Sequence, residues 1–145
     1  MKKLQMSLII FIAILIGAGA YTVYYGQGYS YLSDDPSACM NCHVMEDMYL
    51  TWETSSHRDV TCNECHVPHG FIRQYTAKAT DGIYHAAVFT FDEPQVIRLR
   101  ESRYERISEN CIRCHESMVA FINRGDGQLC TDCHIGVGHP LQYKK

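Results

Sequence analysis

The chain has 145 residues, of which 8 are cysteine and 8 are histidine, and its formal net charge is −3. This length allows one small domain with an appendage. The slight acidic excess argues against nucleic acid as a partner, because phosphate binding requires a concentrated basic face. Equal numbers of cysteine and histidine instead indicate metal or cofactor chemistry, provided that the two residue types are arranged together.

Apolar residues are concentrated at the N-terminus. No charged residue lies between Leu4 and Tyr25, and Lys2 and Lys3 precede this run. A helix of this length spans the roughly 30 Å hydrocarbon core of a bilayer, and the lysines favour a cytoplasmic N-terminus. We therefore expect residues 1–26 to be a single-pass transmembrane anchor in the cytoplasmic (inner) membrane and residues 27–145 to form a periplasmic domain.

A cleaved signal peptide is the alternative for this N-terminal segment. Residues 18–20 (Ala-Gly-Ala) have the small-x-small spacing that signal peptidase recognises. Against cleavage, Tyr21, Tyr24 and Tyr25 continue the run and suit an aromatic belt at the outer membrane surface. A retained anchor is therefore the favoured interpretation.

All cysteines fall in copies of one motif, C-x-x-C-H. The paired cysteines are Cys39 and Cys42, Cys62 and Cys65, Cys111 and Cys114, and Cys130 and Cys133, and the histidines that follow them are His43, His66, His115 and His134. In c-type haem attachment, two thiols bind the porphyrin and the adjoining imidazole ligates the iron. The sequence therefore predicts four covalent c-type haems.

Other uses of paired cysteines explain this pattern less well. Neither zinc nor iron–sulfur sites require a histidine directly after every second cysteine. A thioredoxin-like site needs one cysteine pair in a strand-rich domain. With roughly 30 residues per haem beyond the anchor, the chain is too short to bury a conventional core. We therefore expect a mainly α-helical domain with much irregular structure, whose core is the haems.

The motifs are spaced in a short–long–short order, which indicates two dihaem halves. The second motif of each half carries an acidic residue before its second cysteine, Glu64 or Asp132, and a further histidine shortly afterwards, His69 or His139. An internal duplication would produce this pattern.

Helical periodicity places three helices in the domain. Residues 46–56 are helix-permissive and lead to the region around His57, and residues 71–89 carry a clear apolar stripe. Residues 95–109 predict a charged helix, solvated over most of its surface, with a docking surface as the alternative. Residues 125–127 and 136–140 are expected to form turns.

Four histidines lie outside the haem motifs: His57, His69, His85 and His139. Their number equals the number of distal iron positions in a set of four bis-histidine haems. We favour His57, His85 and His139 as ligands, because few core histidines are needed where haem is the core. His69 follows His66 by only three residues, so it is expected beside the haem edge as a hydrogen-bond donor.

The order of these features resembles the NapC/NrfH family of membrane-anchored tetrahaem cytochrome c quinol dehydrogenases. The resemblance runs from end to end. It rests on the anchor, C-x-x-C-H-x-M at 39–45, C-N-E-C-H-V-P-H at 62–69, K-A-T-D-G-I-Y-H at 78–85, two further C-x-x-C-H motifs and the trailing His139. Within the family, the short length favours the small, membrane-anchored subunit of cytochrome c nitrite reductase.

The resemblance implies an unusual first haem next to the membrane. Its iron would take Met45, so that His43 is displaced, and His85 would lie on the other side, where some members carry aspartate. Lys78 matches a lysine beside the quinol site. Lys78, Asp81 and His85 are therefore the residues expected to bind quinol, menaquinol being the expected species, and to help its protons leave.

The resemblance also implies ligands for the other three haems. The second iron would bind His66 and His139, and the fourth would bind His134 and His57. The third would bind His115 and receive its distal ligand from the catalytic partner.

The resemblance therefore implies an electron-transfer subunit. It would oxidise quinol from the membrane pool and pass the electrons to a periplasmic pentahaem nitrite reductase in a hetero-oligomer, with the conversion of nitrite to ammonia on the partner. Two alternatives stay open: a quinol dehydrogenase that feeds another periplasmic reductase, and a released multihaem electron shuttle, which would require cleavage after Ala20.

Overall fold

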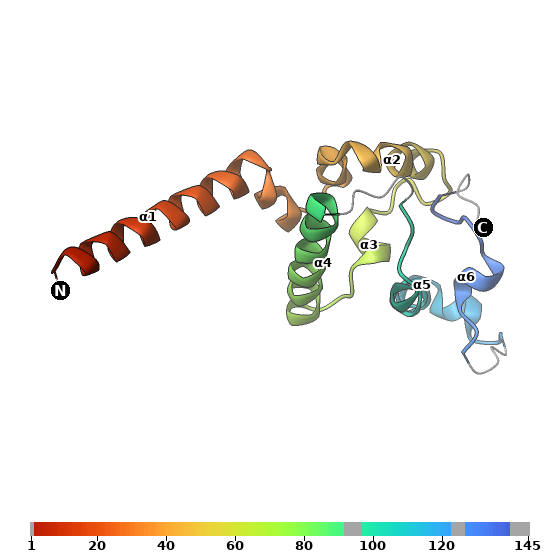
Figure 1. The fold of residues 1–145 in the computed structure, drawn as a ribbon. Helices are drawn as coiled ribbons and strands as arrows, with labels where there is room; N and C mark the ends of the chain where they lie inside the picture. Colours follow the sequence, from red (N-terminus) through yellow and green to blue (C-terminus); the bar gives the residue numbers. More distant parts are fainter. Residues whose placement is uncertain (1, 92–96, 123–126, 140–145) are drawn as a thin grey trace. The chain divides into compact units, whose positions relative to one another are not determined.

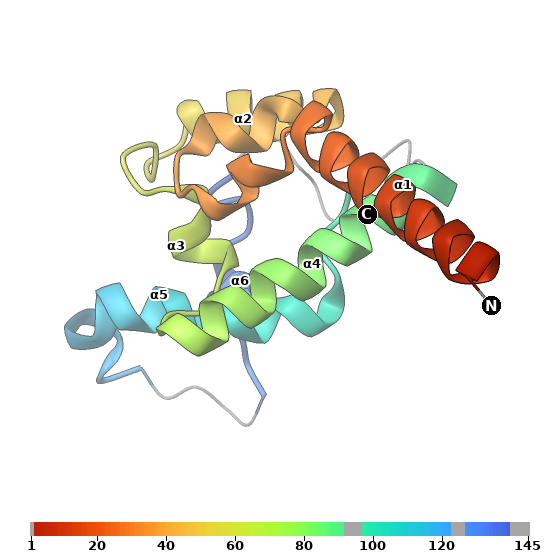
Figure 2. The ribbon, with the colours of Figure 1, turned by 90° about the vertical axis from the view of Figure 1, so that its left-hand side faces the viewer.

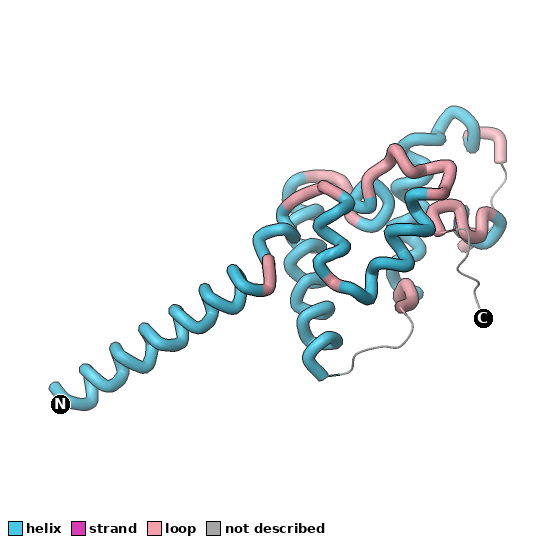
Figure 3. Tube along the Cα trace, turned by 90° about the horizontal axis from the view of Figure 1, so that it is seen from above, coloured by secondary structure: helices cyan, strands magenta, loops and turns pink. Residues whose placement is uncertain are grey.

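The structure is a computed structural model that describes residues 2–91, 97–122 and 127–139. Within these ranges every regular element is helical, joined by loops and turns, as Figure 3 shows. The chain forms two compact units, Met1–Ser33 and Asp34–Lys145. The expectation of a mainly helical chain with much irregular structure is therefore confirmed.

The first unit consists of helix α1 (Lys2–Tyr25) and the 3-10 turn η1 (Gly28–Leu32). Helix α1 is the one described helix that is long and apolar enough to cross a membrane, and none of its residues is buried against the protein. It ends where Gln27 adopts a left-handed conformation with φ of 50°. An exposed apolar helix of 24 residues at the N-terminus is consistent with a membrane anchor.

The second unit begins with short turns that lead into helix α2 (Figure 1). These are the 3-10 turns η2 (Pro36–Asn41) and η3 (His43–Met45), followed by α2 (Glu46–Glu53) and α3 (Cys62–His66). The carboxylate of Asp35 accepts a hydrogen bond from the backbone N–H of Ser37 at 2.8 Å and so caps η2. The helix expected over 46–56 is present and ends at Glu53.

Helix α4 (Phe71–Phe91) confirms the clearest helix of the sequence and extends two residues beyond the predicted end. It starts after Gly70, whose φ of +98° is readily available only to glycine. Its inward face buries Ala77 and Lys78.

The charged segment before the third haem motif differs from its prediction. Residues 97–100 lie outside any helix, and residues 95–96 lie outside the described ranges. Only after the 3-10 turn η4 (Glu101–Arg103) does helix α5 (Tyr104–Val119) begin, and it bends at His115. Turns are present at Gly127 and Gly136, while residues 125–126 and 140 lie outside the described residues.

Helix α5 lies beside both α3 and α6 (Cys130–Cys133), as Figures 1 and 2 show. The buried Asn110 donates from Nδ2 to the carbonyl oxygens of Cys65 and Val67, at 2.9 and 3.0 Å. The buried Ser108 accepts a hydrogen bond at Oγ from the backbone N–H of Cys130 at 3.1 Å. One helix therefore carries the third haem motif and holds the second and fourth in place.

Two arginines of the segment 95–109, which was expected to be mostly solvated, make ion pairs within the domain, as does Arg113 just beyond it. Arg103 and Arg106 both contact the carboxylate of Asp81 on α4, the second at 3.0 Å. Arg113 pairs with Glu64 on α3. These contacts fasten α5 to α4 and α3, so this charge pattern serves packing within the domain.

The described part of the domain buries mainly polar side chains. Ala77 is its only buried apolar residue. The buried polar residues are Thr51, Ser55, Lys78, Ser108 and Asn110. Contacts among amino-acid side chains therefore supply almost no apolar core, which fits a domain whose apolar interior is provided by haem.

Candidate haem centres and the buried lysine

Three of the four C-x-x-C-H motifs lie on helical turns. The second occupies α3, the third lies within α5, and the fourth comprises α6 followed by His134. A helical turn brings residues i, i+3 and i+4 to one face. The backbone therefore presents two thiols and an imidazole to the same side, as covalent haem attachment requires.

The first motif has a different backbone. Cys39 lies in η2, but Cys42 is extended, with φ of −102° and ψ of 114°, and interrupts the turn before His43. His43 is exposed, whereas Met45 is half-buried. The imidazole of this motif thus does not continue a helical face shared with its thiols, and the thioether two residues later is the less exposed of the two possible ligands.

The rings of His66 and His139, which come from distant parts of the sequence, face each other with centroids 6.2 Å apart. A metal–imidazole bond is about 2.0 Å long, so two imidazoles on opposite sides of one ion have centroids about 6 Å apart. Desolvation, with the nearby charges of His139 and Arg106, lowers the pKa of His66 to about 4. Desolvation also lowers the pKa of His139. Both rings are therefore neutral near pH 7, the form that ligates iron.

Thr51 contacts the ring of His139. Its Oγ1 lies 2.9 Å from the carbonyl oxygen of Asp47 and 3.0 Å from that of Met48, both within reach of its hydroxyl hydrogen. Nδ1 of His139 lies 3.1 Å from Oγ1. In the tautomer with hydrogen on Nδ1, Oγ1 accepts from it and Nε2 keeps a free lone pair, the usual arrangement around a metal-bound histidine.

The rings of His57 and His115 form a second imidazole pair, with centroids 6.1 Å apart. The pairing of His57 with His134 that the resemblance implies stays a prediction. The turn after α2 determines the position of His57, because Trp52 donates from Nε1 to the carbonyl oxygens of His57 and Val60 at 3.0 and 2.9 Å. The bend of α5 at His115 provides the opposite ring.

The remaining histidines lie apart from these pairs. His134 is exposed, and within the described residues no other ring packs against it. His85 is exposed on α4, with its ring 6.1 Å from that of Tyr84. His69 has Nε2 3.4 Å from Oε2 of Glu64 and lines a small cavity.

Thiols of successive motifs approach each other. The thiols of Cys39 and Cys62 are near enough to shift each other's pKa, and Cys130 contributes in the same way to the raised pKa of Cys111. Cys65 and Cys114 are close enough to interact electrostatically. The attachment points therefore form one continuous series through the motifs. Helical C-x-x-C-H turns, neutral facing imidazoles and a mostly polar interior fit c-type haem.

Lys78 is buried, with 5% of its side chain exposed, and its Nζ donates to Oδ1 of Asp34 at 2.9 Å. Asn63 donates from Nδ2 to the same oxygen at 2.7 Å. Lys78 also interacts electrostatically with Cys39 of the first motif. The sequence singled out Lys78 but missed Asp34, because no local pattern indicates a partner 44 residues away.

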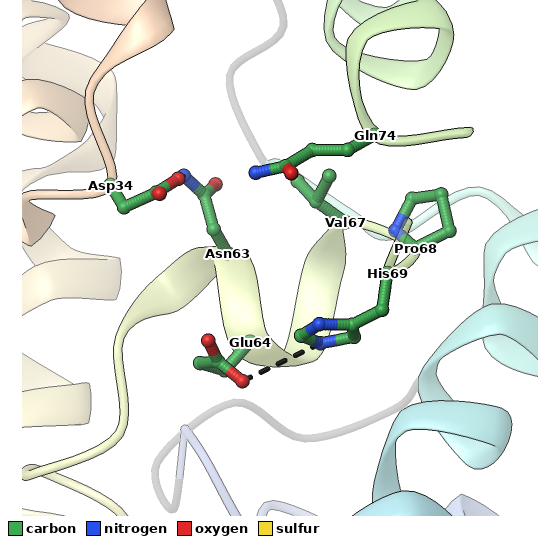
Figure 4. A pocket seen from close by; sticks show the side chains of 7 residues that line it. All are labelled: Asp34, Asn63, Glu64, Val67, Pro68, His69 and Gln74. Carbon is green, nitrogen blue, oxygen red and sulfur yellow. Dashed lines mark hydrogen bonds and ion pairs between the residues drawn. The ribbon is translucent and has the colours of Figure 1, made fainter. Parts of the chain in front are cut away.

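A cavity of about 170 Å³ adjoins this ion pair (Figure 4). Its lining is mainly polar: Asp34, Asn63, Glu64, Val67, Pro68, His69 and Gln74. Figure 4 shows the Asp34 and Asn63 side chains meeting at its edge, with Glu64 and His69 on the side of α3. The volume is sufficient for several water molecules.

Comparison with known proteins decides the family. The model of the NapC/NirT cytochrome c family, N-terminal region, matches residues 1–144. The chain belongs to this family. It is a c-type cytochrome, and its eight cysteines are consistent with several haems.

Relatives within the family extend over most of the chain. It is 38% identical to cytochrome c-type protein NrfH of Wolinella succinogenes, over 95% of this chain and 87% of that protein. It is 31% identical to cytochrome c nitrite reductase subunit NrfH of Nitratidesulfovibrio vulgaris, over 81% and 74%. A crystal structure of the cytochrome c nitrite reductase NrfHA complex bound to the HQNO inhibitor contains a chain with TM-score 0.69 and 28% identity, covering 94% of this chain and 93% of that one.

Proposed function

We infer that the chain is the NrfH-like, quinol-oxidising cytochrome c subunit of a cytochrome c nitrite reductase. The observation that carries this inference is the unit of four C-x-x-C-H motifs in which two imidazole pairs stand at the separation of bis-ligated iron. Its similarity to NrfH proteins over most of the chain supports the same role.

Four haems would be bound through the eight cysteines, and they supply one-electron oxidation and reduction. His66 and His139 would ligate one iron and His57 and His115 another. At the first motif, the break at Cys42 favours Met45 over His43 as the ligand, with His85 on the opposite side. His134 would be the motif ligand of the remaining iron.

The quinol site would lie beside the first haem, at Lys78. Its ammonium is held next to Cys39 by Asp34, and it would donate a hydrogen bond to a quinol oxygen. The carboxylate of Asp81 pairs with the guanidinium groups of Arg103 and Arg106, so Asp81 would position α4 beside the site. His85 lies two turns after Lys78 on the same helix and would complete the site. Menaquinol is the proposed substrate.

Electrons would leave through the series of haem motifs toward a pentahaem catalytic subunit. The second and third irons each have a candidate imidazole pair within this chain, whereas His134 is exposed and has no ring partner among the described residues. On these separations we propose that the partner's ligand completes the fourth haem, whereas the resemblance implies that it completes the third. Helix α1 would anchor the hetero-oligomer in the inner membrane, with the N-terminus cytoplasmic and residues 27–145 periplasmic.

The test uses the full-length, haem-loaded chain in detergent. Intact mass should show four haem additions to a chain that keeps its N-terminus, and a soluble menaquinol analogue should reduce the haems. Nitrite should be consumed only after a pentahaem nitrite reductase is added. Lys78→Leu should lose quinol oxidation while haem content and reduction by dithionite persist. Quinol oxidation at the wild-type rate in this variant would refute the assignment of Lys78.

A further inference from the structure

We propose that Asp34 takes the proton from Lys78 during quinol oxidation and releases it to solvent, so that Asp34 is a proton exit of the quinol site. This inference rests on the proposed function and adds to it a residue outside the α4 motif. The two members of the Lys78–Asp34 ion pair differ in exposure to solvent, because the Lys78 side chain is 5% exposed and that of Asp34 is 59% exposed. The pair therefore connects the interior of the domain to water.

The geometry gives the proton a direct route. Oδ1 of Asp34 lies 2.9 Å from Nζ of Lys78, within hydrogen-bond distance. Asn63 donates to the same oxygen at 2.7 Å and holds the carboxylate in this orientation. These two hydrogen bonds lower the pKa of Asp34, so its carboxylate is ionised near pH 7 and gives up a captured proton to water readily.

Quinol oxidation requires such an acceptor. Each quinol loses two electrons and two protons, and the ammonium of Lys78 has no lone pair with which to take a proton. Loss of one electron to the first haem makes the quinol O–H strongly acidic, and its proton moves to Nζ of Lys78. In the same step Nζ passes one of its own protons to Oδ1 of Asp34, so that the quinol O–H bond and one N–H bond break while a new N–H bond and an O–H bond form. Asp34 releases its proton to water, and the cycle repeats for the second electron.

The other carboxylate of the quinol motif is poorly suited to this step. Asp81 accepts hydrogen bonds from both Arg103 and Arg106, and its side chain is 21% exposed. Its carboxylate is thus less open to water than that of Asp34, whose side chain is 59% exposed. Asp34 has one charged partner and also borders the cavity of Figure 4, where water can receive the proton.

The experiment measures haem reduction by a soluble menaquinol analogue in the full-length, haem-loaded chain by stopped flow. Asp34→Asn should slow reduction by about 100-fold, the typical contribution of general acid–base catalysis. Haem content, haem spectrum and reduction by dithionite should be unchanged. Because Asp34 is exposed, added formate should restore much of the rate by replacing the lost carboxylate, and Asp34→Glu should keep most of it.

Asp59→Asn is the matched control, since it removes the same charge from a side chain that is 94% exposed. It should reduce at the wild-type rate with or without formate. An undiminished rate in Asp34→Asn would overturn the proposal, as would a slow Asp34→Asn variant that formate does not accelerate, since that result marks a purely structural contact. If the wild-type chain and Asp59→Asn both fail to oxidise quinol, the proposed function itself is wrong and this inference falls with it.

Discussion

The first and second C-x-x-C-H motifs have the same spacing but different backbones. The second forms a complete turn of α3, and its imidazole faces His139. The first is divided between two 3-10 turns by the extended Cys42, and its His43 is exposed. The same motif can therefore adopt two backbone conformations. Which imidazole is presented for axial ligation depends on the residues leading to the histidine and on what the rest of the chain places opposite it.

The largest effect should come from replacing a motif histidine that faces a second imidazole, and the same replacement in the first motif should have little effect. His66→Ala removes one ring of a facing pair and should convert one low-spin haem to a high-spin or differently ligated form, with a large loss of haem-loaded protein. His43→Ala should leave the spectrum of all four haems close to wild type, because we expect Met45 to ligate that iron. Electron paramagnetic resonance and haem yield measure both outcomes. Equal damage in the two variants would remove the distinction between the motifs.

The second-largest effect concerns the contacts that hold each motif. Asn110→Leu leaves the carbonyls of Cys65 and Val67 without their buried donor and should lower the free energy of unfolding by about 2–3 kcal/mol. Asp35→Ala removes only an exposed cap next to the first motif and should cost about 0.5–1 kcal/mol. Denaturant unfolding of the haem-loaded chain compares them. A larger loss for Asp35→Ala would contradict the role of α5 as the support of the second motif.

A smaller change should follow from Thr51→Val, which keeps the side-chain shape and removes the acceptor for Nδ1 of His139. The second haem should stay ligated, and its midpoint potential should shift, because the hydrogen bond tunes the basicity of the ligand. Thr80→Val, which removes a hydroxyl bonded only within α4, is the control and should shift no potential. A potentiometric titration resolves the four haems, and identical curves for the two variants would argue against this ligand assignment.

The smallest effect should be a pH dependence at the Lys78–Asp34 pair. The hydrogen bond from Lys78 holds the pKa of Asp34 below its ordinary value of 3.8. Its contribution to stability is therefore complete above that pH and is lost as the pH falls through the lower folded value. Thermal unfolding should be measured between pH 5 and 2 in steps of about 0.5 pH unit. The loss of stability at acid pH should be slightly smaller in Asp34→Asn than in wild type. Asp59→Asn should follow the wild-type curve.

Local signals in the sequence were sufficient for some elements. The apolar N-terminal helix and α4 each follow from a pattern contained in one segment. The predicted start of α5 was wrong because the residues before Tyr104 are rich in arginine and glutamate, which have high helix propensity. This segment has no apolar stripe that would mark the start of a helix. The conformation of its arginines depends instead on the acidic residues with which they pair.

Contacts between distant segments were not predictable in this way. The facing of His57 and His115 depends on a tryptophan that holds the turn after α2 and on a bend in α5, and motif spacing encodes neither. The same holds for Asp34, which reaches Lys78 and Asn63 from the start of the domain. Asn110 likewise looks like an ordinary polar residue of a helix until α3 is placed beside it.

The scarcity of buried apolar side chains has a calorimetric consequence. The heat-capacity change of unfolding is proportional mainly to the apolar surface that becomes exposed to water. In the described part of this domain, contacts between side chains bury a single apolar residue, Ala77. The heat capacity of unfolding of the haem-loaded protein should therefore report chiefly the surface between porphyrin and polypeptide, and should fall in steps as attachment sites are removed one at a time.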